Sequence, residues 1–123
     1  MIKKLEGSTP VLRGEIYLVD FSNQIGSEQG GLRPAVVIQN DEGNRYAPTT
    51  IVCPLTSQAK HMQATHVLLT PKDAGLLKKS TVLCEQVRTI DKSRMKRKVA
   101  KISNPQKMAD IEKKIMISFG IIA

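Results

Sequence analysis

The sequence predicts an α+β fold in which short, twisted antiparallel β-strands curl into a small barrel and one α-helix closes the chain. Runs rich in β-branched residues, separated by Gly, Pro, Asn and Asp, follow one another as far as residue 102. Only residues 103–122 change to helical spacing of apolar side chains. The length of 123 residues suits a single domain, with residues 1–12 expected as an N-terminal extension.

Six strands are expected, at residues 14–21, 34–40, 49–56, 65–70, 80–88 and 97–102. The first is rich in β-branched and aromatic residues, and strand alternation places Ile16 and Leu18 on one face. The second is an apolar run with Pro34 at its first residue, where a missing backbone N–H costs least. The third contains Pro54, which favours an edge position or a bulge. The last three are short β-branched runs bounded by turn residues.

The connections are expected to be a glycine-rich loop at 22–33, turns at 41–48 and 71–75, and a polar loop at 57–64. The terminal helix has a clear start signal. Ser103 or Asn104 can cap it, and the Pro that follows suits the first helical position.

The composition limits the kind of protein this is. Hydrophobic residues make up 41% and aromatic residues 3% of the chain, so the core is expected to consist mainly of Ile, Val, Leu and Met. Tyr17 and Phe21 should belong to that core, and Tyr46 should be exposed. No apolar run approaches the ~20 residues that cross a bilayer, and the N-terminus lacks the apolar stretch of a signal peptide. We therefore expect a cytoplasmic protein.

The two cysteines, Cys53 and Cys84, each lie inside an apolar run, where a free thiol behaves as a small hydrophobic group. They share no metal-ligand spacing with each other or with His61 and His66, so no metal site and no cofactor are predicted.

The net charge of +8 lies in the second half of the chain. Residues 1–71 hold six Lys and Arg against six Asp and Glu, whereas residues 72–123 hold thirteen against five. The densest cluster, KSRMKRKVAK at 92–101, indicates a surface for a polyanion or for an acidic protein, with a solvated strand face as the alternative.

The loop GSEQGGLRP is the most informative stretch for chemistry, because the sequence contains no nucleophile elbow, paired metal histidines or P-loop. Its glycines let the backbone approach a ligand closely, while Glu28, Gln29 and Arg33 offer acceptors and donors. Arg33 precedes a proline, which biases its backbone toward extended geometry. The alternative is a surface loop in which Arg33 simply pairs with Glu28.

The blocks RGEIYLVDF, GSEQGGLRPAVVIQND, PTTIVCPLTS, THV and EQVRTIDKSRM resemble, in this order, those of the MazF/PemK family of toxin endoribonucleases from bacterial toxin–antitoxin modules. The resemblance extends from Arg13 to the last helix. It implies a barrel-like sheet with helices, of the SH3-like type also found in CcdB gyrase poisons, assembled as a homodimer. It also implies metal-independent cleavage of single-stranded RNA at short sequences.

The family's catalytic pair, an arginine before proline and a threonine that closes the next strand, corresponds to Arg33 and Thr56. RNA supplies its own nucleophile, the 2′-hydroxyl. A guanidinium and a hydroxyl donor suit the negative charge that then develops on the phosphoryl oxygens. The products implied are a 2′,3′-cyclic phosphate and a 5′-hydroxyl. Glu28 is expected either to accept the 2′ proton or to orient Arg33.

Seven residues are candidates for RNA binding: Ser27, Glu28, Gln29, His66, Glu85, Gln86 and Arg88. The resemblance places an RNA-contacting histidine at His66, with a surface or capping histidine as the alternative. Gln86 and Arg88 lie two residues apart in the expected strand, so their side chains are expected to point to the same side and line the same groove. In a regular strand Glu85 would point to the same side as the apolar Leu83 and Val87, so either it pairs with a buried cation or a bulge breaks the alternation.

These observations favour an mRNA interferase restrained by an antitoxin whose acidic, disordered segment lies in a basic groove. The alternative is a non-enzymatic CcdB-like toxin that binds DNA gyrase, for which a catalytic pair is unnecessary. A third hypothesis is a non-catalytic nucleic-acid-binding barrel that uses residues 92–101 for phosphate contacts.

Overall fold

The computed structural model describes residues 10–22, 25–26, 28, 30–59 and 61–123. The strands in this part of the chain are β1 (Glu15–Phe21), β2 (Gly31–Val37), β3 (Thr49–Thr56), β4 (His66–Leu69), β5 (Ser80–Leu83), β6 (Arg88–Asp91) and β7 (Met95–Lys101). The helices are α1 (Asp41–Tyr46), α2 (Pro71–Ala74) and α3 (Pro105–Ser118), with 3₁₀ turns η1 (Cys84–Gln86) and η2 (Lys92–Arg94). Of the expected N-terminal extension, residues 1–9 lie outside the described residues.

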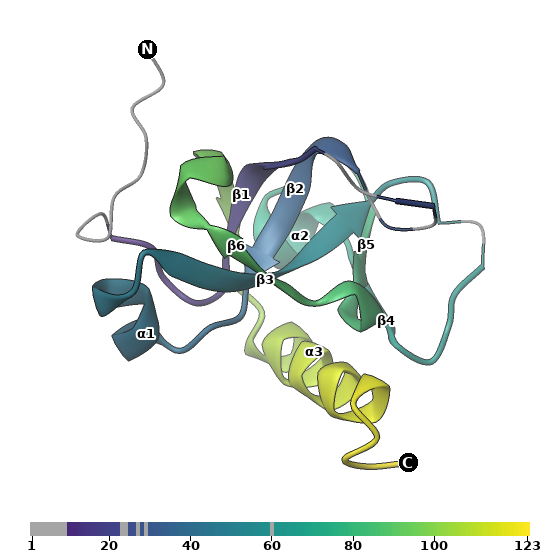
Figure 1. Cartoon of the computed structure of the whole chain (residues 1–123). Coiled ribbons are helices and arrows are strands. Elements are labelled where there is room, and N and C mark those ends of the chain that lie inside the picture. The colour runs from purple at the N-terminus through teal and green to yellow at the C-terminus, as the bar shows by residue number, and fades with distance from the viewer. Residues whose placement is uncertain (1–9, 23–24, 27, 29, 60) are drawn as a thin grey trace.

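All strand pairs are antiparallel, in the order β4-β5-β3-β2-β1-β7, with β6 also paired to β3 (Figure 1). The predicted α+β class, with antiparallel strands followed by a C-terminal helix, is confirmed. The sheet is twisted, as predicted, but the barrel is not closed, because no pairing joins β4 to β7 within the described residues. β3 explains this shape. One side of it pairs first with β6 and then with β5, so the sheet divides there.

Several predicted strand bounds need correction. β2 begins at Gly31 and ends at Val37, so Pro34 lies inside the strand, opposite Leu18, and not at its first residue. Pro54 lies in a central strand, between the residues that pair with β6 and those that pair with β5, where one side of β3 pairs with no other described strand. The expected strand 80–88 is interrupted by η1, and this raises the number of strands from the predicted six to seven.

Two expected turns are short helices. Residues 41–46 form α1, whose cap Asn40 accepts a hydrogen bond from Gly43 N at 2.8 Å. Residues 71–74 form α2. Thr70, which precedes this helix, donates hydrogen bonds to the Asp73 carboxylate across its first turn, and Gly75 ends the helix in the left-handed conformation. These caps are side-chain contacts that a count of turn-forming residues does not reveal.

The core consists of two clusters on opposite faces of the sheet. Neighbouring residues of one strand belong to different clusters, as Ile16 and Tyr17 do in β1 and Val36 and Val37 do in β2, because strand side chains alternate between faces. Phe21 is fully buried and Tyr46 is 72% exposed, as predicted.

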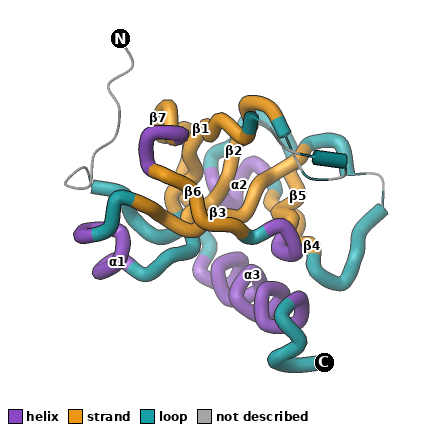
Figure 2. The backbone as a smooth tube through the Cα atoms, viewed as in Figure 1, coloured by secondary structure: helices purple, strands orange, loops and turns teal. Residues whose placement is uncertain are grey.

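Helix α3 covers the first cluster through Ile111, which is fully buried, and it packs against β4 and η1 (Figure 1). The predicted start is confirmed: Asn104 accepts a hydrogen bond from Gln106 N at 3.0 Å, and Pro105 is the first helical residue. Figure 2 shows β7 beside β1 on the far side of the sheet from β4.

Cys53 and Cys84 are both free and fully buried in the first cluster, as predicted. Their mutual hydrogen bond, together with burial, raises the pKa of the Cys53 thiol. In the described part of the chain, no helix is both long and apolar enough to span a membrane.

Asp73 ties α2 to the start of α3. Its carboxylate accepts hydrogen bonds from Thr70 N at 2.8 Å and from Asn104 Nδ2 at 3.0 Å, and these two contacts hold its pKa below the usual 3.8. An aspartate with a lowered folded pKa contributes stability that is present above the unfolded pKa and is lost as the pH falls through the folded one.

We therefore expect Asp73→Asn to be less stable than the wild type at neutral pH and to lose less of its unfolding free energy as the pH falls below about 4. Urea unfolding followed by circular dichroism at several pH values measures both effects. Glu42→Gln, which changes an exposed carboxylate on α1, should retain the wild-type pH dependence. Identical pH profiles for Asp73→Asn and the wild type would contradict the assignment.

Candidate active site

An open groove of about 750 Å³ lies where the start of β2 and the C-terminal ends of β3 and β5 meet the start of β4. Its walls come from β2, from the segment that follows β3, and from η1. The lining residues are Leu32, Arg33, Pro34, Leu55, Thr56, Ser57, Gln58, Ala59, His61, Gln63, His66, Leu83, Glu85 and Gln86. Five residues predicted from the sequence as site residues are therefore brought together: Arg33, Thr56, His66, Glu85 and Gln86.

The strand register explains why Arg33 and Thr56 lie in one groove. Ala35 of β2 lies opposite Pro54 of β3, and the pairing is antiparallel. Arg33 and Thr56 each lie two residues beyond this pair, where the two strands border the groove, and both line it. Along their strands they have the same alternation as Ala35 and Pro54, so their side chains are expected to point to the same side of the sheet.

Arg33 lies within β2 and not in the preceding loop, contrary to prediction. Its Nε donates a hydrogen bond to the carbonyl of Gly30 at 2.9 Å, and its side chain is half-buried. This bond does not use the two terminal amino groups of the guanidinium. The neighbouring Gly31 has φ of +75°, a conformation that glycine adopts without the strain of a Cβ. A glycine at this point therefore helps to set the carbonyl that orients Arg33.

The alternative that Arg33 pairs with Glu28 is not what the structure shows. Glu28 Oε1 accepts a hydrogen bond from Ile25 N at 2.9 Å, and among the described residues no ion pair joins Glu28 to Arg33.

Thr56 is half-buried at the end of β3. Its Oγ1 accepts a hydrogen bond from Gln58 N at 3.1 Å. A backbone N–H can only donate, so this contact uses a lone pair of the hydroxyl and leaves its hydrogen available to donate to a ligand. The same bond fixes the start of the segment that follows β3.

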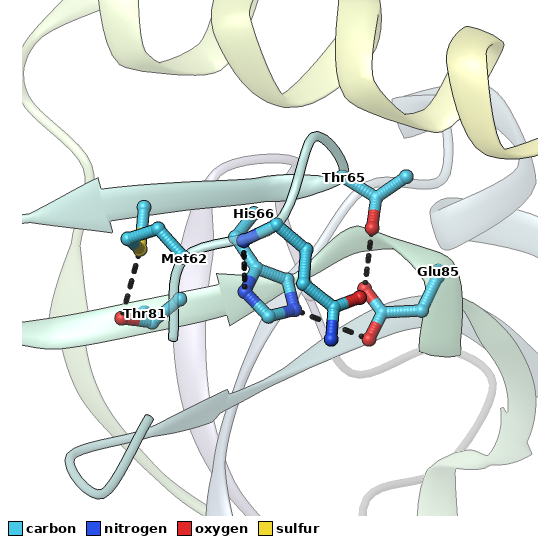
Figure 3. A network of polar contacts seen from close by, with 6 residues as sticks. Met62, Thr65, His66, Thr81 and Glu85 are labelled. Carbon is cyan, nitrogen blue, oxygen red and sulfur yellow. Dashed lines mark hydrogen bonds and ion pairs between the residues drawn. The ribbon is translucent and has the colours of Figure 1, made fainter. Parts of the chain in front are cut away.

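The buried His66 and the exposed Glu85 form a polar contact on another wall of the groove (Figure 3). His66 Nε2 lies 3.2 Å from Glu85 Oε2, and Gln63 N donates to His66 Nδ1 at 3.2 Å. The other carboxylate oxygen of Glu85 accepts from Thr65 Oγ1 at 3.0 Å. The parity problem at Glu85 is resolved by η1, which ends the strand alternation after Leu83.

The remaining predicted RNA-binding residues lie elsewhere. Ser27 and Gln29 fall outside the described residues. Glu28 and Arg88 are not among those that line the groove. The guanidinium of Arg88, the first residue of β6, lies 5.4 Å from the centre of the Phe21 ring. Gln86 and Arg88 do not lie in one strand as expected, because Gln86 is the last residue of η1 and Arg88 is the first residue of β6.

None of the candidate site residues predicted from the sequence comes from the segment 57–64. It supplies Ser57, Gln58, Ala59, His61 and Gln63 to the groove, and Figure 2 shows the connection from β3 to β4 extending beyond the strands. A signal was present, because this polar segment directly follows the strand that ends in Thr56.

The basic cluster 92–101 does not form one continuous surface. Lys92 is 1% exposed and donates a hydrogen bond to the carbonyl of Asn44, and burial lowers its pKa. Lys98 Nζ lies 2.8 Å from Glu15 Oε2. Arg97 and Lys98 line a second hollow that shares Pro34 with the groove. Only part of the predicted footprint therefore lies near the site.

The described His, Cys, Asp and Glu side chains include no group of three or more that lie close enough together to hold a metal ion.

Comparisons with known proteins give matches that cover most of the chain. The model of the PemK-like, MazF-like toxins of type II toxin–antitoxin systems matches residues 12–119. MazF from Deinococcus radiodurans is 28% identical over 89% of this chain and 96% of its own, with a TM-score of 0.76. The same organism's MazF in a MazE–MazF crystal structure is 27% identical over 92% and 98%, with a TM-score of 0.72. An endoribonuclease from a mycobacterial species, solved with its cognate antitoxin, has the same fold at 21% identity over 92% and 98%, with a TM-score of 0.76.

Proposed function

The chain belongs to the PemK-like, MazF-like family of toxins of type II toxin–antitoxin systems, and from this premise we propose that it is a sequence-specific endoribonuclease that cleaves single-stranded RNA without a metal ion. One observation carries the proposal: Arg33 and Thr56 both line one open groove. The mycobacterial and Deinococcus proteins with this fold include enzymes described as endoribonucleases.

In the proposed reaction the ribose 2′-oxygen attacks the adjacent phosphorus, and the bond from phosphorus to the 5′-oxygen breaks. The products are a 2′,3′-cyclic phosphate and a 5′-hydroxyl. The proton lost by the 2′-hydroxyl is balanced by the one gained at the departing 5′-oxygen. Negative charge develops on the phosphoryl oxygens, where donors held in advance by the protein are most effective.

Arg33 and Thr56 would supply those donors. The terminal guanidinium nitrogens of Arg33 can bind two phosphoryl oxygens, because its Nε already holds the side chain to Gly30. Thr56 can add a third hydrogen bond, because its lone pair and not its hydrogen is used by Gln58. A guanidinium offers only hydrogen-bond donors and no acceptor, so Arg33 would stabilise the developing charge and could not act as a base.

The walls of the groove support recognition of a defined RNA sequence. Gln58, His61, Gln63 and Gln86 line it, and their amides and imidazole can form hydrogen bonds with base edges. The groove lining includes no aromatic ring of Phe, Tyr or Trp, so stacking would contribute little.

We also propose that the protein is a cytoplasmic homodimer neutralised by an antitoxin with an acidic, disordered segment. The net charge of +8 favours both RNA and such a segment. Exposed apolar side chains at the end of α3, including Phe119 at 61% and Ile121 at 64%, favour a protein contact there.

The direct test is incubation of the purified protein with a long mixed-sequence RNA in EDTA, followed by mapping of the fragment ends. Cuts at one short sequence, with 2′,3′-cyclic phosphate on one side and 5′-hydroxyl on the other, are expected. RNA that stays intact across varied sequences would contradict the proposal, and inhibition of DNA gyrase would then be measured.

Gly31→Ala should weaken both folding and cleavage, because a side chain at φ +75° is strained by about 1 kcal/mol and relief of that strain would displace the Gly30 carbonyl that holds Arg33. Urea unfolding and kcat/KM for RNA measure the two effects. Gly75→Ala is the matched control, since Gly75 has φ +72° and also has open space at its Cβ, but lies outside the groove lining. It should lose stability alone, and an equal loss of activity in both variants would contradict the role given to Gly31.

A further inference from the structure

We propose that His66 and Glu85 are positioning residues, which hold the segment 57–64 against the groove through one tautomer of the His66 imidazole, with its hydrogen on Nε2. The effect of this on RNA rests on the proposed function, whereas the tautomer and the loop contact do not.

The tautomer follows from the two partners of the ring (Figure 3). Gln63 N lies 3.2 Å from His66 Nδ1, and a backbone N–H can only donate, so Nδ1 carries a lone pair. Nε2 lies 3.2 Å from a Glu85 carboxylate oxygen, which accepts, so Nε2 carries the hydrogen. The His66 side chain is only 6% exposed, which leaves little room for water to replace either partner.

His66 holds Gln63 twice. Its imidazole accepts from Gln63 N, and its own backbone N donates to the Gln63 carbonyl at 3.0 Å. The reciprocal pair closes a turn at the end of the segment. The neighbouring Met62 Sδ lies 4.0 Å from the hydroxyl of Thr81, which gives the same part of the segment a weaker second contact with β5.

Glu85 keeps the ring in this form. One carboxylate oxygen faces Nε2, and the other is held by Thr65 Oγ1 at 3.0 Å. The backbone strengthens the connection, because Cys84 N donates to the Thr65 carbonyl at 3.1 Å. The segment is therefore linked through His66 to Glu85 in η1, an element that packs against α3.

The other end of the segment is held by Thr56, which accepts from Gln58 N. Between these two anchors the segment presents His61 and Gln63 to the groove. A shift at the His66 anchor would move these side chains relative to Arg33 and Thr56. The expected consequence is weaker and less selective RNA binding with little change in the chemical step.

Two substitutions at His66 separate the roles of its ring nitrogens. In His66→Asn the side-chain oxygen lies near the position of Nδ1 and can still accept from Gln63 N. In His66→Gln the amide reaches the position of Nε2 and can still meet Glu85, but nothing replaces Nδ1. We expect His66→Gln to raise KM several-fold more than His66→Asn does, with kcat changed less than KM in both.

Glu85 gives a second matched pair. In Glu85→Gln the amide oxygen can accept from Nε2 while the amide nitrogen donates to Thr65 Oγ1, so the tautomer is retained. Glu85→Ala leaves Nε2–H without its acceptor. The conservative variant should therefore rescue the KM that Glu85→Ala raises.

Two readouts do not depend on cleavage. Long-range ¹H–¹⁵N NMR should show hydrogen on Nε2 of His66 in the wild-type protein, and amide exchange at Gln63 should be faster in His66→Gln than in His66→Asn. Hydrogen on Nδ1, or equal exchange in the two variants, would overturn the proposal. If the wild type cleaves no RNA, the proposed function fails, but these two measurements still decide whether His66 positions the segment.

Discussion

Arg33→Ala is expected to lower kcat/KM for RNA cleavage by a factor of about 10² to 10³, because it removes a cation from the place where the phosphoryl charge develops. The loss should appear mainly in kcat, since the charge is greater in the transition state than in bound RNA. Arg33 makes one backbone hydrogen bond, to Gly30, so stability should change by only about 1 kcal/mol. Single-turnover cleavage of an RNA with one mapped site, beside urea unfolding, measures both quantities.

Arg33→Lys is the matched control. It keeps the charge but loses the planar fork and the Nε contact with Gly30, so its activity should lie between those of Arg33→Ala and the wild type. Arg88→Ala removes an arginine that lies over Phe21 and outside the groove lining, and its effect on kcat should be small. If Arg88→Ala lowered kcat as much as Arg33→Ala does, a general loss of positive charge would explain both.

Thr56→Ala should reduce kcat by about 10²-fold, as expected when one donor to a developing oxyanion is lost. Thr56→Ser retains the hydroxyl that accepts from Gln58 N and donates to the phosphoryl group, so it should retain most of the activity. Thr56→Val keeps the shape of the side chain without the hydroxyl and should behave as Thr56→Ala does. Full activity of Thr56→Val would show that the hydroxyl takes no part in the reaction.

The two side chains should also depend on each other. If Arg33 and Thr56 bind the same phosphoryl group, the double alanine variant should lose less than the product of the two single losses, because residues that act as a unit are not additive. If the two single losses of activity multiplied in the double variant, the two side chains would contact the RNA at different points.

The elements predicted best from the sequence are those whose pattern is local. β1, β3, β4 and α3 closely match their predicted ranges, since alternation defines the strands and the Asn104 cap with Pro105 defines the helix start. The α+β class and the burial of Phe21 follow from the same patterns. The family resemblance also pointed to Arg33 and Thr56 before their common groove was known.

Other features depend on contacts that no local pattern records. The run 80–88 contains enough β-branched and apolar residues to predict one strand, yet it turns at η1, because β5 before the turn and β6 after it pair with different parts of β3. Lys92 belongs to the most basic run of the sequence but is buried against the carbonyl of Asn44. Residue periodicity and charge counts reveal neither that β5 and β6 pair with different parts of β3 nor that the amine of Lys92 is buried.

By itself the sequence determined the class of fold, the strands β1, β3 and β4 and the terminal helix, and its family resemblance indicated the two residues proposed to act on RNA. Local periodicity and capping are short-range effects, so the residues that carry them are neighbours in the chain. Only the tertiary structure decided that the sheet stays open, that Arg33 and Thr56 line one groove, and that His66 joins Gln63 to Glu85. These depend on strand register and on hydrogen bonds between distant segments, which packing of the whole chain sets.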